Sequence, residues 1–169
     1  MNWTQMLEQQ VNDVYHATEG LLELVDDDQL DWKPETGTNW MTTGQLLTHL
    51  TNACGSAMKG FVTGDWGMPE EMTEEDMLPP AEKLPTAPSV AWTRKKLAAD
   101  KQLALDMIAQ AGEENLANKT VSAPWNATPR PLGYQLSEMI AHLASHKSQL
   151  FYYLKLQGKP VHTGNLWGM

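Results

Sequence analysis

Hydrophobic residues recur every three or four positions in four segments of the chain, the spacing that is typical of amphipathic helices. Stretches rich in Gly and Pro separate the segments and indicate loops. The expected helices span residues 3–25, 42–64, 89–112 and 132–157. No strand-like alternation of useful length is found. The pattern therefore predicts an all-α protein, a four-helix bundle formed by one domain over residues 1–169.

Local signals support several of these helix ends. Thr42 is followed three positions later by Gln45, which has the form of a capping box. The third helix is expected to begin near Ser89 and to stop at Gly112, because glycine commonly ends helices. The fourth ends before Gly158 in the same way. It is the longest and most regular of the four.

A long loop is expected between the second and third helices. Residues 65–87 contain four prolines and too little apolar periodicity for another element. A loop of this length inside a compact domain is usually functional or mobile, so it can cover a site.

Composition and charge narrow the possible functions. Apolar residues make up 41% of the 169 residues and charged residues 20%, an ordinary balance for a folded domain. The formal net charge of −9 disfavours nucleic acids and anionic membranes as partners. No apolar stretch is long enough to span a membrane, and the residues after Met1 do not form a leader. With Cys54 as its one cysteine, the chain is expected to be cytoplasmic.

Three histidines have the spacing of a metal site. His142 and His146 are four residues apart on the fourth expected helix, so one ion can reach both. His49 lies at the border of the apolar stripe on the second helix. The spacing of His142 and His146 can also arise by chance, and His49 can also be an ordinary core histidine. Three converging imidazoles would leave a coordination position open, as catalytic rather than structural sites do.

Short motifs around these histidines resemble the DinB/YfiT-like family of proposed metalloenzymes. They are Trp32-Lys33-Pro34, the segment from Thr43 to Leu50, and the segment from His142 to Leu150. The resemblance implies a four-helix bundle, often dimeric, in which a histidine of the second helix and two of the fourth bind a divalent metal, commonly zinc or nickel. By position, the metal ligands are His49, His142 and His146. Lys147-Ser148 stands where the family often has Arg-Gly, which leaves the subgroup open.

Other polar residues near the histidines have two readings each. Asn52, Ser56, Glu138, Ser145 and Gln149 can orient an imidazole, or they can simply be solvated. Glu138 can also act as a catalytic general base towards a metal-bound water.

Three residues are not expected at the metal. Cys54 is about 140° around the helix from His49, so it is a poor fourth ligand and is expected to be a small buried side chain. His16 and His162 are expected to be surface or packing residues.

The leading hypothesis is a metal-dependent enzyme that acts on a small-molecule substrate. The resemblance implies either hydrolysis or a transferase or isomerase reaction that uses a low-molecular-weight thiol as cosubstrate, and it also implies a homodimer. The alternatives are a non-catalytic bundle that binds a small molecule or stores or senses metal, and a bundle without any metal.

Overall fold

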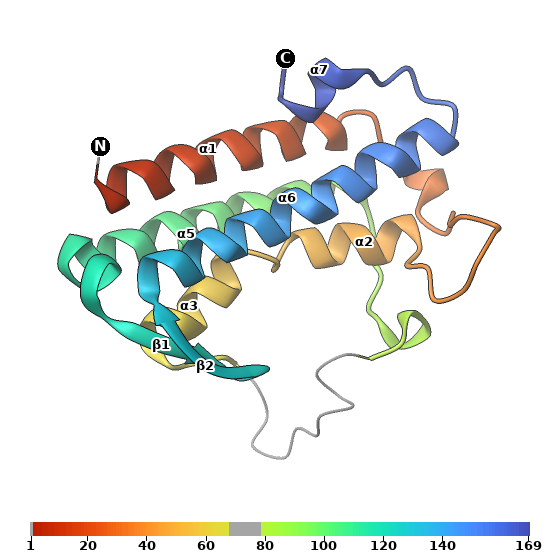
Figure 1. The fold of residues 1–169 in the computed structure, drawn as a ribbon. Coiled ribbons are helices and arrows are strands. Elements are labelled where there is room, and N and C mark those ends of the chain that lie inside the picture. Colours follow the sequence, from red (N-terminus) through yellow and green to blue (C-terminus); the bar gives the residue numbers. More distant parts are fainter. Residues whose placement is uncertain (1, 68–78) are drawn as a thin grey trace.

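Helices make up most of the structure, a computed structural model that describes residues 2–67 and 79–169 (Figure 1). The all-α prediction is correct in outline, with one small sheet added. Within the described ranges, no helix is long and apolar enough to cross a membrane. The helices are α1 (Trp3–Leu22), α2 (Thr43–Leu50), α3 (Gly55–Thr63), α5 (Val90–Asn118), α6 (Leu132–Leu156) and α7 (Thr163–Leu166), with 3-10 turns at Asp27–Gln29 and Ala81–Lys83.

The three long helices α1, α5 and α6 pack against one another, and α2 and α3 pack on α5 and α6 (Figure 1). Their apolar stripes meet in one core. Leu7, Leu97, Ile108, Leu143 and Leu150 are all fully buried in it. The spacing of three and four residues therefore identified the buried faces of α1 and α6 correctly, but that of α5 only in part.

Two of the expected helix starts are confirmed by their caps. The Thr42 hydroxyl accepts the Gln45 N–H at 3.2 Å, and Gln45 Oε1 accepts the Thr42 N–H at 2.8 Å. This is the reciprocal arrangement of a capping box, and it begins α2. At the start of α5, the Ser89 hydroxyl accepts the Trp92 N–H at 3.1 Å.

The second expected helix is wrong as a continuous element, because the chain breaks between α2 and α3. Cys54 has φ −126° and ψ −72°, outside the helical region. The apolar pattern continues across the break, since Leu50, Ala53 and Met58 are all buried, so periodicity could not reveal it. The break allows close contact with α5: a Cβ on Gly55 would lie 2.1 Å from the Asp100 carbonyl oxygen.

The region after Gly112 also differs from expectation. Gly112 interrupts α5 with φ 69° and ψ 160°, a conformation that glycine adopts readily, and a further helical turn follows to Asn118. An antiparallel hairpin comes next, formed by β1 (Thr120–Ala123) and β2 (Asn126–Pro131), with Thr120 opposite Pro131. These strands are short and largely exposed, so they carry no clear alternation of apolar residues.

The expected loop over residues 65–87 is only partly described, since residues 68–78 lie outside the described ranges. Its later part contains the 3-10 turn Ala81–Lys83 and is tied to α2. The Gln45 side-chain amide donates to the carbonyl oxygens of Ala81 and Leu84, at 2.6 and 3.1 Å.

Candidate metal centre

The three histidines singled out from the sequence come together between α2 and α6. His49 lies in the last turn of α2, while His142 and His146 lie on successive turns of α6. The Nε2 atom of His142 is 3.0 Å from that of His146 and 3.3 Å from that of His49. All three side chains are partly buried, and one ligand atom from each lies within 4.8 Å of the others, so the group could hold a metal ion.

A backbone carbonyl determines which nitrogen of His142 carries the hydrogen. His142 Nδ1 is 3.0 Å from the carbonyl oxygen of Ala53, in the break between α2 and α3. Because a carbonyl oxygen only accepts hydrogen bonds, Nδ1 must donate. The neutral ring then has its lone pair on Nε2, the atom that faces the other two histidines.

A series of hydrogen bonds determines which nitrogen of His146 carries the hydrogen. The Tyr153 hydroxyl donates to the Met41 carbonyl at 2.9 Å and accepts from the Gln149 side-chain amide at 3.2 Å. The amide nitrogen of Gln149 therefore faces Tyr153, and its Oε1 faces His146 Nδ1 at 3.1 Å. Since Oε1 can only accept, Nδ1 of His146 carries the hydrogen and Nε2 again presents its lone pair.

Aromatic packing fixes the position of Tyr153 in this series of hydrogen bonds. The buried Tyr153 ring makes edge-to-face contacts with Trp32 at 5.2 Å and Trp40 at 6.2 Å between ring centroids. Such pairs restrain ring orientation. Trp32, the first residue of one sequence motif, thus supports the residue that orients Gln149 and, through it, His146.

The donor set fits a small divalent cation. Two lone pairs 3.0 Å apart on His142 and His146 repel each other, and a cation between them removes the repulsion. In a tetrahedral zinc site, metal–nitrogen bonds of about 2.0–2.1 Å place two imidazole nitrogens about 3.3 Å apart. The separations of 3.0 and 3.3 Å are close to this value. Three imidazoles suit zinc or nickel and not calcium or magnesium.

Burial disfavours the protonated forms of His49 and His146. Burial, followed by the neighbouring charges of His146 and His142, lowers the pKa of His49 from 6.5 to about 4. Burial is also the main cause of the lowered pKa of His146. Both rings are therefore neutral near pH 7, the form that binds metal.

The metal-free protein is expected to lose stability as the pH falls from 6.5 towards 4. In this range His49 is protonated in the unfolded chain but neutral in the folded one, so acid favours unfolding. Above this range the histidine is neutral in both states and makes no such contribution. Melting temperatures of chelator-treated wild type and His49→Gln at about pH 7.5 and about pH 5 would check this. The variant should show the smaller fall, and equal falls would contradict the expectation.

Other residues proposed near the metal occupy different places. Cys54 is fully buried, as expected, and burial followed by the charge of Asp100 raises the pKa of its thiol to about 12. It therefore offers no thiolate near neutral pH. Glu138 is exposed one turn before His142 and lines a small pocket with Trp125 and Arg130. It is not part of the group that could hold an ion, so its role as a base stays a prediction.

Of the four remaining polar candidates, only Gln149 is hydrogen-bonded to a histidine of the group. The Ser145 hydroxyl donates to the Ala141 carbonyl, and the Ser56 hydroxyl donates to Asp100. Asn52 is exposed.

His16 and His162 lie outside the group and are exposed, as expected. His16 lies 3.1 Å from the Gly168 carbonyl oxygen, and His162 caps α7.

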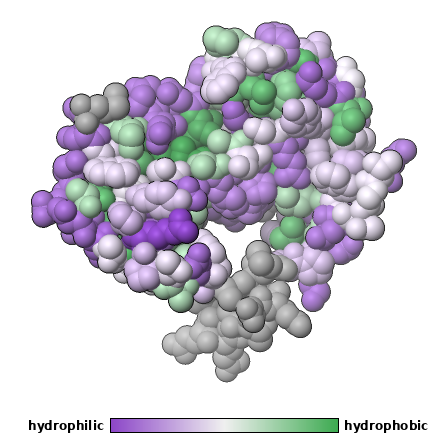
Figure 2. Space-filling view, viewed as in Figure 1, coloured by the Kyte–Doolittle hydropathy of each residue, from purple (hydrophilic) through white to green (hydrophobic). Residues whose placement is uncertain are grey.

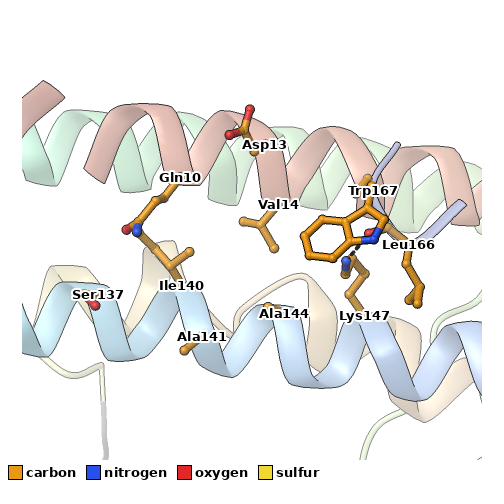
Figure 3. Close-up of a pocket in the computed structure, with 11 residues that line it drawn as sticks. Gln10, Asp13, Val14, Ser137, Ile140, Ala141, Ala144, Lys147, Leu166 and Trp167 are labelled. Carbon is orange, nitrogen blue, oxygen red and sulfur yellow. Dashed lines mark hydrogen bonds between the residues drawn. The ribbon is translucent and has the colours of Figure 1, made fainter. Parts of the chain in front are cut away.

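A separate groove of about 310 Å³ lies between α1 and α6 (Figure 3), and none of the three histidines lines it. Val14 of α1 and Ile140 of α6 point into it, and Lys147 points towards Trp167 at one end (Figure 3). Figure 2 shows hydrophobic residues gathered along this seam. The groove residues of α6 lie on a different face of the helix from His142 and His146, so the groove is not part of the candidate site.

Two groups that help to orient the histidines, Tyr153 through Gln149 and the Ala53 carbonyl directly, were not singled out from the sequence. Tyr153 had one available signal, since it lies four residues after Gln149 and hence on the same face of α6. The Ala53 carbonyl had none, because a backbone group has no sequence signature and the helix break that exposes it arises from tertiary contacts.

Comparison with known proteins agrees with the site. A search of curated proteins found no match, and neither did a search of solved structures. The family model of the DinB superfamily matches residues 10–150. This range includes all three histidines and most of the chain. The chain therefore belongs to the DinB superfamily.

Proposed function

We propose that the protein is a metal-dependent enzyme in which His49, His142 and His146 hold one zinc or nickel ion. One observation carries this proposal: the Nε2 atoms of these residues converge, while the Nδ1 atoms of His142 and His146 are engaged by Ala53 and Gln149. Partners that orient the ligands in this way are characteristic of metal sites. Three protein ligands leave a position open for a substrate, which favours a catalytic over a structural role.

The proposed reaction is either hydrolysis or transfer or isomerisation with a low-molecular-weight thiol, on a small-molecule substrate. The ion supplies Lewis-acid chemistry, lowering the pKa of a nearby water or thiol. The thiol cosubstrate is proposed from the family resemblance, and the buried Cys54 is not positioned to provide that thiol itself. Glu138 is the proposed base. We also propose that the protein is a four-helix bundle in which α2 and α3 together form the second helix. Two such bundles are proposed to form a homodimer.

Protein purified without a histidine tag should contain about one divalent ion per chain. Elemental mass spectrometry would measure it, before and after treatment with a chelator and re-addition of Zn²⁺ or Ni²⁺. Only traces of metal, with none taken up on re-addition, would refute the site.

Turnover separates an enzyme from the alternative of a non-catalytic bundle. The metal-loaded protein should act on a panel of esters and amides, or on electrophiles offered with a small thiol. The activity should vanish with the chelator and return with the ion. Stoichiometric metal without turnover on any substrate would favour storage, sensing or small-molecule binding.

A further inference from the structure

Asp100 of α5 is a buried carboxylate with four hydrogen-bond donors around it. Its exposed fraction is 4%. Oδ2 accepts from the Tyr15 hydroxyl at 2.7 Å and the Gly55 N–H at 3.0 Å. Oδ1 accepts from the Ser56 N–H at 2.8 Å and the Ser56 hydroxyl at 2.9 Å. All four bonds use the carboxylate as acceptor, an arrangement that suits the ionised form and compensates its burial.

Three of these bonds fix the first two residues of α3, just after the break that separates it from α2. Gly55 and Ser56 are the first residues of α3, so their N–H groups have no partner within the helix. The negative charge of Asp100 also suits the positive end of the helix dipole. The absence of a side chain at Gly55 allows the close approach, since a Cβ there would lie 2.1 Å from the Asp100 carbonyl oxygen.

The anchored break exposes the group that orients His142. Ala53 lies two positions before Gly55, and its carbonyl accepts the His142 Nδ1–H at 3.0 Å. In an uninterrupted helix this carbonyl would instead accept from the N–H four residues ahead. The interruption therefore redirects a backbone acceptor from the helix to the imidazole.

We propose that Asp100 is a positioning residue of the metal centre. By holding Gly55 and Ser56, it keeps the Ala53 carbonyl against His142 Nδ1 and so selects the ring form whose Nε2 lone pair faces the other histidines. Tyr15 of α1 assists by fixing one carboxylate oxygen. This role rests on the proposed metal site for its purpose, but the tautomer of His142 can be measured in metal-free protein.

Asp100→Asn tests the role with little change in volume. The variant replaces one acceptor oxygen with an NH₂ group, which must face a donor on one side or the other. The affinity of the full chain for Zn²⁺, measured by competition with a chelator, should fall about 10- to 100-fold, as it does when an outer partner of a ligand is lost. Long-range ¹H–¹⁵N NMR of metal-free protein should show His142 losing its single Nδ1–H tautomer.

Two further variants separate positioning from general stability. Leu116→Ala truncates a fully buried residue beyond the Gly112 kink of the same helix, so it should lower the melting temperature but leave the Zn²⁺ affinity and the His142 signal unchanged. Tyr15→Phe removes one of the four donors to Asp100 and should give a smaller change of both readouts, in the same direction as Asp100→Asn.

The outcomes distinguish the two proposals. Wild-type Zn²⁺ affinity and an unchanged His142 signal in Asp100→Asn would overturn the positioning role while leaving the metal site intact. If wild type binds no Zn²⁺, the proposed function fails, and the NMR comparison still decides whether Asp100 controls His142. If Asp100→Asn does not fold, Tyr15→Phe decides, and an unchanged His142 signal in it would overturn the role.

Discussion

Replacing His142 with alanine should remove the bound metal and leave the helices intact. His142 is the central member of the proposed ligand set, since its Nε2 lies 3.0 Å from that of His146 and 3.3 Å from that of His49. Two imidazoles from different helices would remain. We expect the affinity for Zn²⁺ to fall by more than the roughly 10- to 100-fold that accompanies loss of an outer partner.

The fold should survive because the apolar core, and not the metal, supplies most of the burial. His142 is only partly buried, whereas Leu136, Leu143 and Leu150 on the same helix are fully buried and unchanged. The melting temperature should fall modestly, since an ion that binds only the folded state stabilises it by mass action. Any activity that depends on the metal should disappear.

His16→Ala is the matched control. It removes an exposed imidazole that contacts the Gly168 carbonyl and none of the three ligands, so it should retain wild-type metal content. Circular dichroism and metal analysis on the same preparation would check both variants. An unfolded His142→Ala would show that the ion is structural, and full metal retention would show that His142 is not a ligand.

The fold was predictable wherever local pattern and tertiary structure agree. The buried stripes of α1, α5 and α6 have the expected three- and four-residue spacing, and the caps at Thr42 and Ser89 are where the sequence placed them. The break after Leu50 was not predictable, because the apolar spacing runs through it and Asp100, which bonds the first residues beyond it, lies on another helix. The hairpin was not predicted, because its strands are short and mostly exposed and so lack an alternation of apolar residues.

The candidate site was also predictable only where local sequence carries the signal. The three histidines could be proposed from spacing and family resemblance, and Gln149 from its position three residues after His146. The Ala53 carbonyl and Asp100 could not be proposed, because they reach the site through chain segments that meet only in the folded state. Helical spacing also favoured Glu138, which lies one turn before His142 and whose role as a base stays a prediction.

Gly55→Ala and Gly20→Ala should change the free energy of unfolding in opposite directions, although helix propensity alone predicts that both stabilise. Alanine favours a helix interior over glycine by about 0.5–1 kcal/mol. Gly20 lies in α1, and a Cβ there would meet nothing within 4 Å. Gly20→Ala should therefore raise the free energy of unfolding by about that amount.

At Gly55 the close approach of α3 to α5 outweighs propensity. An added Cβ would lie 2.1 Å from the Asp100 carbonyl oxygen and 3.0 Å from the Ala104 amide nitrogen. Both are backbone atoms, so the helices must separate, and overpacking of this kind costs about 1–3 kcal/mol or more. The shift should also loosen the bonds of Asp100 to Gly55 and Ser56 and weaken Zn²⁺ binding through Ala53. Urea denaturation of the two variants beside wild type would measure the free energies. A Gly55→Ala protein as stable as Gly20→Ala would contradict the close approach of α3 to α5, and with it the means by which Asp100 holds the break.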